Sequence, residues 1–204
     1  MKEIITTIDL IRHGEPMGGK KYRGQIDDPL SEKGYLQMRE AVGDFRGWEH
    51  IVTSPLSRCS AFAHELGEKL GIGVSEDPNL MEVAFGSWEG KTSQELRAAD
   101  PDIIRNFKRD PIGCRPEGAE ALDAFYSRVK NAWESTLIKY KGRHVLLVIH
   151  AGVIRMIIAN VLGIPLERVY RLQVESASLS RIIVEGEGQD AMGNLLFHGG
   201  HITA

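Results

Sequence analysis

Two arginines and two histidines stand where three predicted strands end. Arg12 and His13 close a β-branched apolar run that begins at residue 4, and His150 ends the apolar run "HVLLVIH". Arg58 lies in the first turn of the helix predicted after "HIVTSP". In an open α/β sheet, ligands bind outside the carboxyl ends of the strands. Arginine donates charge-assisted bidentate hydrogen bonds to phosphate oxygens, and histidine can act as a nucleophile or donor near neutral pH. The four residues therefore predict a site for one small dianion.

A proton donor would complete this chemistry, because the leaving oxygen of a phosphate ester must be protonated. The segment "LMEVAFGSWEG" supplies Glu82, with Glu89 as the second choice. Each residue also has a structural interpretation, since a lone strand-end arginine is usually an ion-pair partner and a lone histidine a hydrogen-bonded structural group. Glu15 is expected to pair with a neighbouring basic group. The coincidence of four such residues at one sheet edge favours a functional site.

The loop after the first strand also resembles a nucleotide-binding motif. From Gly14 to Lys20 the spacing reads G-x-x-x-x-G-K. A P-loop continues with serine or threonine and opens a helix whose amides face the phosphates. Here Lys21 follows, and the next residues have no helical apolar face. The nucleotide interpretation is therefore disfavoured, and Lys20, Lys21 and Arg23 either line the mouth of the site or form a solvated loop.

Length and composition limit the class of protein. The 204 residues suffice for one α/β domain, and a formal net charge of -3 without a long basic run argues against a nucleic-acid partner. No apolar stretch reaches the roughly 20 residues of a membrane span. The N-terminus has no signal-peptide pattern, so a cytoplasmic location is expected. Cys59 and Cys114 form no C-x-x-C pair, which argues against a disulfide framework or a structural zinc site. The oligomeric state is not specified by the sequence.

Strand and helix patterns alternate along the chain. Ser31 is a predicted helix cap, Pro55 stops a strand, and Gly71 ends the helix after it. The alternation predicts an α/β fold, a three-layer α/β/α sandwich with a mostly parallel central sheet, in a single domain over 1–204. Residues 76–117, the least regular segment, are expected to form a small insertion or cap over the carboxyl ends of the strands. The predicted helices cover residues 31–45, 57–71, 118–140 and 152–163, and the predicted strands cover residues 4–11, 50–55, 144–150, 178–186 and 193–200.

Six segments of the chain together resemble one protein family. "LIRHGE" resembles the RHG signature of the histidine phosphatase superfamily, also called phosphoglycerate mutase-like. Five further segments resemble blocks of that family and follow the family's order. These segments are "RGQIDDPLSEKG", "TSPLSRCSAFA", "PNLMEVAFGSWEG", "PEGAEALDAFYSRV" and "VIHAGVIR". The resemblance covers nearly the whole chain.

The resemblance implies a mechanism. His13 would attack phosphorus and become a phosphohistidine, while Arg12, Arg58 and His150 would hold the transferring oxygens. Glu82 would first protonate the leaving oxygen and then activate a water molecule. The ligand would be a small-molecule phosphate ester. No metal or cofactor is implied, because the arginines take the place of magnesium.

The resemblance also extends the phosphate-binding set beyond these five residues. Gly14, Gln25 and Ala151 would belong to it. Where the family usually has Ser-His-Gly, this chain has Ile149, then His150, then Ala151. We expect modest effects on the rate from these changes, because the histidine itself remains. The tail "HGGH" has the spacing of a metal pair, but a solvated terminus is the favoured interpretation of His198 and His201.

The segment after Glu82 resembles the phosphatase branch of the family, which includes α-ribazole phosphatase-like proteins, because the longer insertion of phosphoglycerate mutases is missing. α-Ribazole 5′-phosphate is therefore the leading named substrate. A phosphoglycerate mutase, a broad-specificity sugar or phosphoserine phosphatase and a non-catalytic phosphate-binding module remain alternatives. The aromatic residues of the insertion would form an apolar wall for the base or only pack the insertion down. The wall would consist of Phe85, Trp88 and Phe107, with Lys108, Arg109 and Arg115 meeting polar groups.

Overall fold

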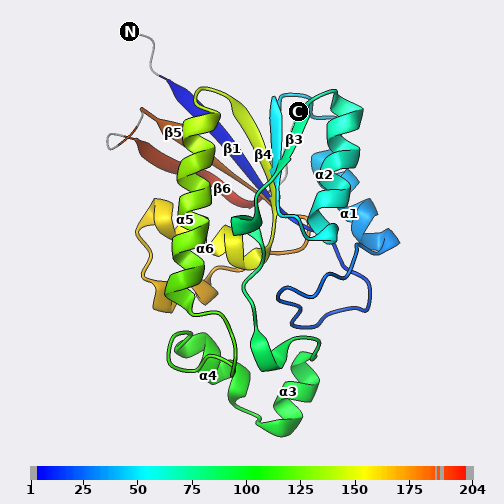
Figure 1. The fold of residues 1–204 in the computed structure, drawn as a ribbon, viewed down its shortest axis with the longest axis vertical. Helices are drawn as coiled ribbons and strands as arrows, with labels where there is room; N and C mark the ends of the chain where they lie inside the picture. Colours follow the sequence, from blue (N-terminus) through cyan, green and yellow to red (C-terminus); the bar gives the residue numbers. More distant parts are fainter. Residues whose placement is uncertain (1–3, 187, 189–190, 201–204) are drawn as a thin grey trace.

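The computed structural model describes residues 4–186, 188 and 191–200, and these residues form a sheet between two helical layers (Figure 1). The sheet has six strands in the order β3-β2-β4-β1-β5-β6. Within it, β3, β2, β4 and β1 pair in parallel, whereas β5 pairs antiparallel with both β1 and β6. The strands are β1 (Ile5–Arg12), β2 (His50–Thr53), β3 (Gly73–Glu76), β4 (His144–Ile149), β5 (Leu179–Glu185) and β6 (Met192–Gly200).

Helices cover both faces of the sheet. The helices α5 (Leu122–Lys139) and α6 (Ala151–Leu162) pack on one face, and α1 (Glu32–Val42) and α2 (Ser57–Leu70) pack on the other. Alternation of side chains along β1 supplies both cores, since Leu10 packs with the α5 and α6 residues and Ile11 with those of α1 and α2. The predicted α/β fold with a mostly parallel central sheet between helices is confirmed. None of the helices in the described ranges is long and apolar enough to cross a membrane.

Parallel pairing brings the carboxyl ends of three strands to the same edge. Arg12 stands opposite Ile149 in the β1–β4 pair, and β2 ends beside β4 at nearly the same level. The backbone N–H of His13 then donates to the Ile149 carbonyl at 3.0 Å. His13 and His150, which are 137 positions apart in the sequence numbering, therefore follow neighbouring strands at one edge.

Local signals set the helix boundaries near this edge. The Ser31 side chain accepts a hydrogen bond from the Gly34 N–H and caps α1, and Gly71 ends α2 in the left-handed region at φ 68°. Both boundaries are as predicted. Helix α5 begins at Leu122 and not at residue 118, because Gly118 adopts φ 70° in the turn that precedes the helix.

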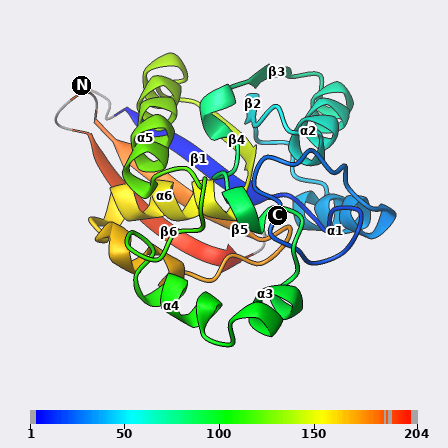
Figure 2. The ribbon, with the colours of Figure 1, turned by 60° about the horizontal axis from the view of Figure 1, so that its bottom comes forward.

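Residues 76–117 contain short helices that the sequence interpretation missed. They are the 3₁₀ turns η1 (Pro78–Leu80) and η2 (Gly86–Trp88) and the helices α3 (Ser93–Ala99) and α4 (Ile103–Arg109). Figures 1 and 2 show α3 and α4 at the end of the molecule toward which β1 and β4 run. Thr92 and Glu95 form a capping box that begins α3, a signal readable in the sequence. The single domain over 1–204 with 76–117 as its cap stays a prediction.

Candidate active site

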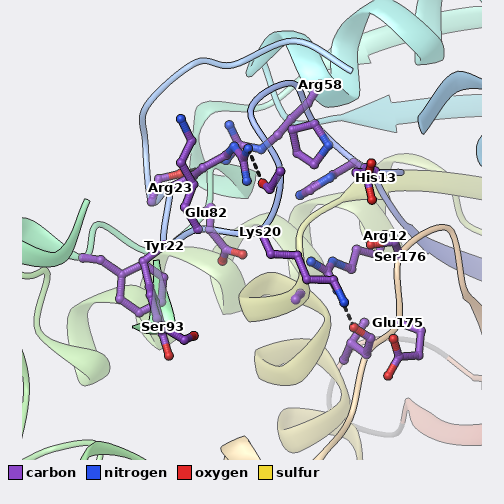
Figure 3. Close-up of a pocket in the computed structure, with 18 of the residues that line it drawn as sticks. Arg12, His13, Lys20, Tyr22, Arg23, Arg58, Glu82, Ser93, Glu175 and Ser176 are labelled. Atoms are coloured by element: carbon purple, nitrogen blue, oxygen red, sulfur yellow. Dashed lines mark hydrogen bonds between the residues drawn. The ribbon is translucent and has the colours of Figure 1, made fainter. Parts of the chain in front are cut away.

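A cavity of about 700 Å³ opens at the carboxyl ends of β1 and β4. Five of the predicted site residues line it, namely Arg12, His13, Arg58, Glu82 and Ala151. They come from the end of β1, the start of α2, the segment after η1 and the start of α6. Figure 3 shows the labelled arginines, His13 and Glu82 gathered around one space. The structure thus brings together side chains from separate elements, as the sequence predicts.

His13 lines the cavity, and one of its ring nitrogens is held by the backbone. Its Nδ1 lies 2.7 Å from the Gly14 carbonyl oxygen, which can only accept, so Nδ1 carries the proton and the Nε2 lone pair is free. The side chain lines the cavity although only 6% of the residue is exposed. Burial first, and then the charges of Arg12 and Arg58, hold the pKa of His13 well below its ordinary value. The imidazole is therefore neutral at pH 7 and able to attack an electrophile.

The two arginines are anchored by backbone carbonyls. Arg58 donates from Nη1 to the Ile26 carbonyl at 2.7 Å and from Nη2 to the Gly24 carbonyl at 2.8 Å. Arg12 donates from Nη1 to the Val174 carbonyl at 2.7 Å, and this bond is drawn in Figure 3. The Nε atoms of both arginines are buried without a hydrogen-bond partner. Fixed guanidinium groups with unused buried donors are suited to an oxyanion ligand.

His150 lies behind His13 and does not line the cavity wall itself. The two rings meet edge to face with their centroids 5.2 Å apart, and His150 is fully buried. Its Nε2 lies 2.8 Å from Ser54 Oγ and 3.6 Å from Cys59 Sγ. Burial and then the charge of Arg58 hold the pKa of His150 well below its ordinary value. Direct contact between His150 and a phosphate oxygen stays a prediction.

Glu82 faces the cavity from the segment after η1. One carboxylate oxygen accepts from the Val83 N–H at 3.1 Å, and the other accepts from the Gly152 N–H at 3.2 Å in the first turn of α6. Glu89 is placed differently, because its carboxylate accepts from the backbone N–H groups of Phe85 and Gln25 at 2.9 and 3.2 Å. Glu82 therefore lines the cavity, whereas Glu89 lies outside its lining and holds two backbone segments together. The role of Glu82 as the proton donor stays a prediction.

Gly14 and Gln25, two residues of the predicted phosphate-binding set, do not line the cavity. A side chain on Gly14 would collide with the backbone of Gly34, so a glycine is required for packing against α1. Gln25 donates from Nε2 to the Glu82 carbonyl at 3.3 Å. Both residues thus support the site through neighbouring backbone. Their role in phosphate binding stays a prediction, while Ala151 lies at the cavity wall.

Arg128 on α5 was missed by the sequence interpretation. Its guanidinium donates to the backbone carbonyls of Asn79, Met81 and Glu82 at 2.7, 2.7 and 3.1 Å. A two-point ion pair with Glu120, at 2.7 and 2.9 Å, fixes the guanidinium from the other side. Arg128 therefore clamps the irregular segment that carries Glu82 to a regular helix.

The outer wall of the cavity is both aromatic and basic. Phe85, Phe107 and Lys108 line it as predicted, but Trp88, Arg109 and Arg115 do not. Trp88 is instead buried against Phe107 in the core beneath α3 and α4, which is the packing alternative for that aromatic residue. Further lining residues were missed by the sequence interpretation, and they include Tyr22, Ser93, Arg155, Tyr170 and Glu175.

The basic loop after β1 borders the cavity, and Lys20 within it is exposed. Lys20, Lys21 and Arg23 all line the cavity. Lys21 and Arg23 share Asp28 at 2.8 and 2.9 Å. The expected pairing of Glu15 is confirmed by its 3.0 Å contact with Lys33.

His198, one of the two tail histidines, contacts other protein groups. His198 lies 2.8 Å from Ser180 Oγ and 2.6 Å from the Gln173 carbonyl oxygen. His201 falls outside the described residues. Among the residues that are described, no cluster of three histidine, cysteine or acidic side chains is placed to hold a metal ion.

The depressed pKa values of His13 and His150 predict a pH-dependent stability. In unfolded chains histidine binds a proton near pH 6.5, whereas both folded groups resist protonation. The unfolded state therefore binds more protons below that pH, so the free energy of unfolding falls as the pH falls. As the pH falls from about 7.5 to about 5.5, each histidine should lower the free energy of unfolding by about 1 kcal/mol. Urea denaturation at a series of pH values measures this change.

The variants His13→Asn and His150→Asn isolate this effect from other titrating groups. Each should reduce the loss of stability on acidification by about the contribution of one histidine. Equal pH dependence in the unmodified protein and in both variants would show that the folded histidines titrate normally.

Comparison with known proteins adds an independent finding. A model of the histidine phosphatase superfamily (branch 1) matches residues 8–193. A bifunctional protein of Mycobacterium tuberculosis is 33% identical over 180 residues, which are 86% of this chain and 49% of that protein. This chain therefore spans about half the length of that relative.

Solved structures agree in fold. A mycobacterial glucosyl-3-phosphoglycerate phosphatase has a TM-score of 0.85 at 26% identity, over 94% of this chain and 97% of that one. A candidate α-ribazole-5′-phosphate phosphatase of Escherichia coli has a TM-score of 0.80 at 25% identity, over 96% of each chain. Both share the whole architecture with this chain.

Proposed function

This chain belongs to the histidine phosphatase superfamily, and on that premise we propose that it is a metal-independent phosphomonoester phosphatase that acts through a phosphohistidine. The state of His13 carries the proposal. Its ring is neutral, Nδ1 is held by the Gly14 carbonyl, and the free Nε2 belongs to a side chain that lines the cavity with two arginines. Such an imidazole is suited to attack on a phosphorus atom whose oxygens are bound by guanidinium groups.

The reaction would proceed in two displacements. His13 Nε2 would form a bond to phosphorus while the bond from phosphorus to the ester oxygen breaks, and Glu82 would give its proton to that oxygen. Glu82 would then take a proton from water as the water oxygen attacks phosphorus and the bond to Nε2 breaks. Inorganic phosphate and free His13 would result. The charges of Arg12 and Arg58 would stabilise the transferring group in both steps, which is the part that magnesium plays in other phosphoryl transfers.

The substrate would be a small phosphorylated metabolite, and α-ribazole 5′-phosphate is its named candidate. Likeness to the E. coli protein supports this candidate, as do Phe85 and Phe107 at the cavity wall. A phosphoglycerate mutase and a broad-specificity sugar or phosphoserine phosphatase are the nearest alternatives. A non-catalytic phosphate-binding module is disfavoured, because the chain retains both His13 and Glu82 at the cavity. The cytoplasmic location and the lack of a nucleic-acid partner stay predictions.

A substrate panel tests the proposal. Phosphate release should be measured with p-nitrophenyl phosphate, α-ribazole 5′-phosphate, sugar phosphates and phosphoserine, each with and without a chelator. We expect hydrolysis that changes less than about twofold with chelator, because guanidinium groups supply the positive charge. Activity lost to the chelator and restored by magnesium would contradict the metal-independent mechanism. Substantial exchange between the phosphoglycerates without phosphate release would contradict the phosphatase assignment.

A further inference from the structure

The outer half of the cavity has positive charge that the structure leaves unbalanced. Eight lysine and arginine residues line the cavity against three glutamates, so a phosphate dianion alone does not account for the charge. Arg12 and Arg58 are assigned to the phosphate, while Lys21, Arg23 and Lys33 have carboxylate partners. The remaining cations are Lys20, Lys108 and Arg155, and none of them has an ion-pair partner within the described ranges of the chain.

Arg155 is the best placed of these three cations. It stands on α6 four residues after Ala151, so both side chains point to the same face of the helix, with Cβ atoms about 5–6 Å apart. Ala151 lies at the phosphate end of the cavity, and Arg155 therefore lines the wall one helical turn farther on. Lys20 and Lys108 make no hydrogen bond or ion pair to the described residues, whereas Arg155 is held in position by Leu172 and Tyr170.

The anchoring of Arg155 leaves part of its guanidinium unused. Nε donates to the Leu172 carbonyl at 3.0 Å, and the guanidinium carbon lies 5.4 Å from the centre of the Tyr170 ring. No hydrogen bond to protein is made by either Nη within the described part of the chain. Two free Nη groups on a fixed plane match the two oxygens of a carboxylate.

Glu82 attracts Arg155 electrostatically but forms no ion pair with it. Both carboxylate oxygens of Glu82 accept backbone N–H groups, and no ion pair joins the two side chains. Burial lowers the pKa of the Arg155 guanidinium from its ordinary value. A largely buried cation that has no direct ion-pair partner among the described residues is costly, and an anionic ligand at this point would offset that cost.

We propose that Arg155 binds a carboxylate of the substrate, placed a few bonds from the phosphorylated oxygen. The inference rests on the proposed phosphatase function and narrows its substrate class. Under this proposal, phosphorylated hydroxy or amino acids would be better substrates than phosphates of neutral alcohols. The latter group includes α-ribazole 5′-phosphate, so the proposal ranks the candidate named above lower. Arg155 acts as a specificity residue and takes no part in bond breaking.

The test compares 3-phosphoglycerate with glycerol 3-phosphate, which carries a hydroxymethyl group in place of the carboxylate. The unmodified protein should favour 3-phosphoglycerate by at least about tenfold in kcat/KM, because a hydrogen bond to a charged group contributes enough binding free energy for a difference of that size. Arg155→Met should lower kcat/KM for 3-phosphoglycerate by roughly 10- to 100-fold and that for glycerol 3-phosphate by less than about threefold. Arg155→Lys should recover part of the preference, because it keeps the charge without the planar fork.

The ratio of the two kcat/KM values is the decisive readout, because partial unfolding of a variant lowers both values equally. Arg168→Met is a matched control, since Arg168 is exposed on η3 (Leu166–Arg171) and lies outside the cavity lining. It should keep the ratio of the unmodified protein. Equal use of the two esters by that protein, or equal loss of both in Arg155→Met, would overturn the inference while leaving the phosphatase function intact. Failure to hydrolyse even p-nitrophenyl phosphate would overturn both.

Discussion

His13→Asn should reduce turnover by about 10⁶-fold, the scale seen when a covalent nucleophile is removed from an enzyme. The side-chain amide of asparagine retains an N–H that can donate to the Gly14 carbonyl, so the local fold should be preserved. It has no lone pair on nitrogen that could attack phosphorus. Phosphate release from p-nitrophenyl phosphate measures the loss directly.

Covalent labelling gives a second readout for the same variant. During turnover of a ³²P-labelled ester, the unmodified protein should carry label that survives alkali and is lost in acid, as a phosphohistidine does. His13→Asn should carry none. His64→Asn is the matched control, because His64 is exposed and pairs with Glu76 at 3.0 Å, away from the cavity. Normal labelling in His13→Asn would assign the nucleophile to another residue.

The sequence predicts the placement of His13 and His150 because that placement follows from local patterns. Apolar β-branched runs specify parallel strands, and parallel strands bring their carboxyl ends to one edge. The helix boundaries at Ser31 and Gly71 follow from capping chemistry in the same way. These features need no knowledge of distant contacts.

The contacts that hold the site residues in place depend on tertiary structure, so local sequence patterns do not predict them. Arg128 acts on carbonyl groups 46 to 49 positions away, and nothing near it in the sequence marks those partners. Asp9 interrupts an apolar strand as a charged residue. It is stabilised by Trp48, His144 and Arg181, which come from three other parts of the chain.

Two other misses had signals that could have been used. The capping box of Thr92 and Glu95 marks the start of α3 within residues 76–117. Arg155 stands one helical turn after Ala151, so the residue spacing alone places it on the face of α6 that lines the cavity. Strand β3, by contrast, is absent from the predicted strands and has no such signal. It has four residues with one large apolar side chain, and it forms by pairing with the edge of β2.

Glu82→Gln should slow hydrolysis in proportion to how much the leaving group needs a proton. For an alkyl phosphate the loss in kcat/KM should be roughly 10²- to 10⁴-fold, the usual contribution of a general acid. For p-nitrophenyl phosphate it should be less than about tenfold, because nitrophenolate leaves without protonation. The amide side chain has nearly the same shape, so the change tests proton transfer and not packing. A series of aryl and alkyl phosphates of increasing leaving-group pKa measures the slope.

Glu89→Gln is the control for a purely structural carboxylate. Glu89 accepts hydrogen bonds from Phe85 and Gln25 and does not line the cavity, so any loss should be the same for every leaving group. A slope against leaving-group pKa that steepens in Glu82→Gln and stays unchanged in Glu89→Gln would identify the acid. If the two variants exchanged these behaviours, Glu89 would be the donor and the bound state would differ from the present geometry. A uniform loss in Glu82→Gln would instead limit Glu82 to holding the start of α6 through Gly152.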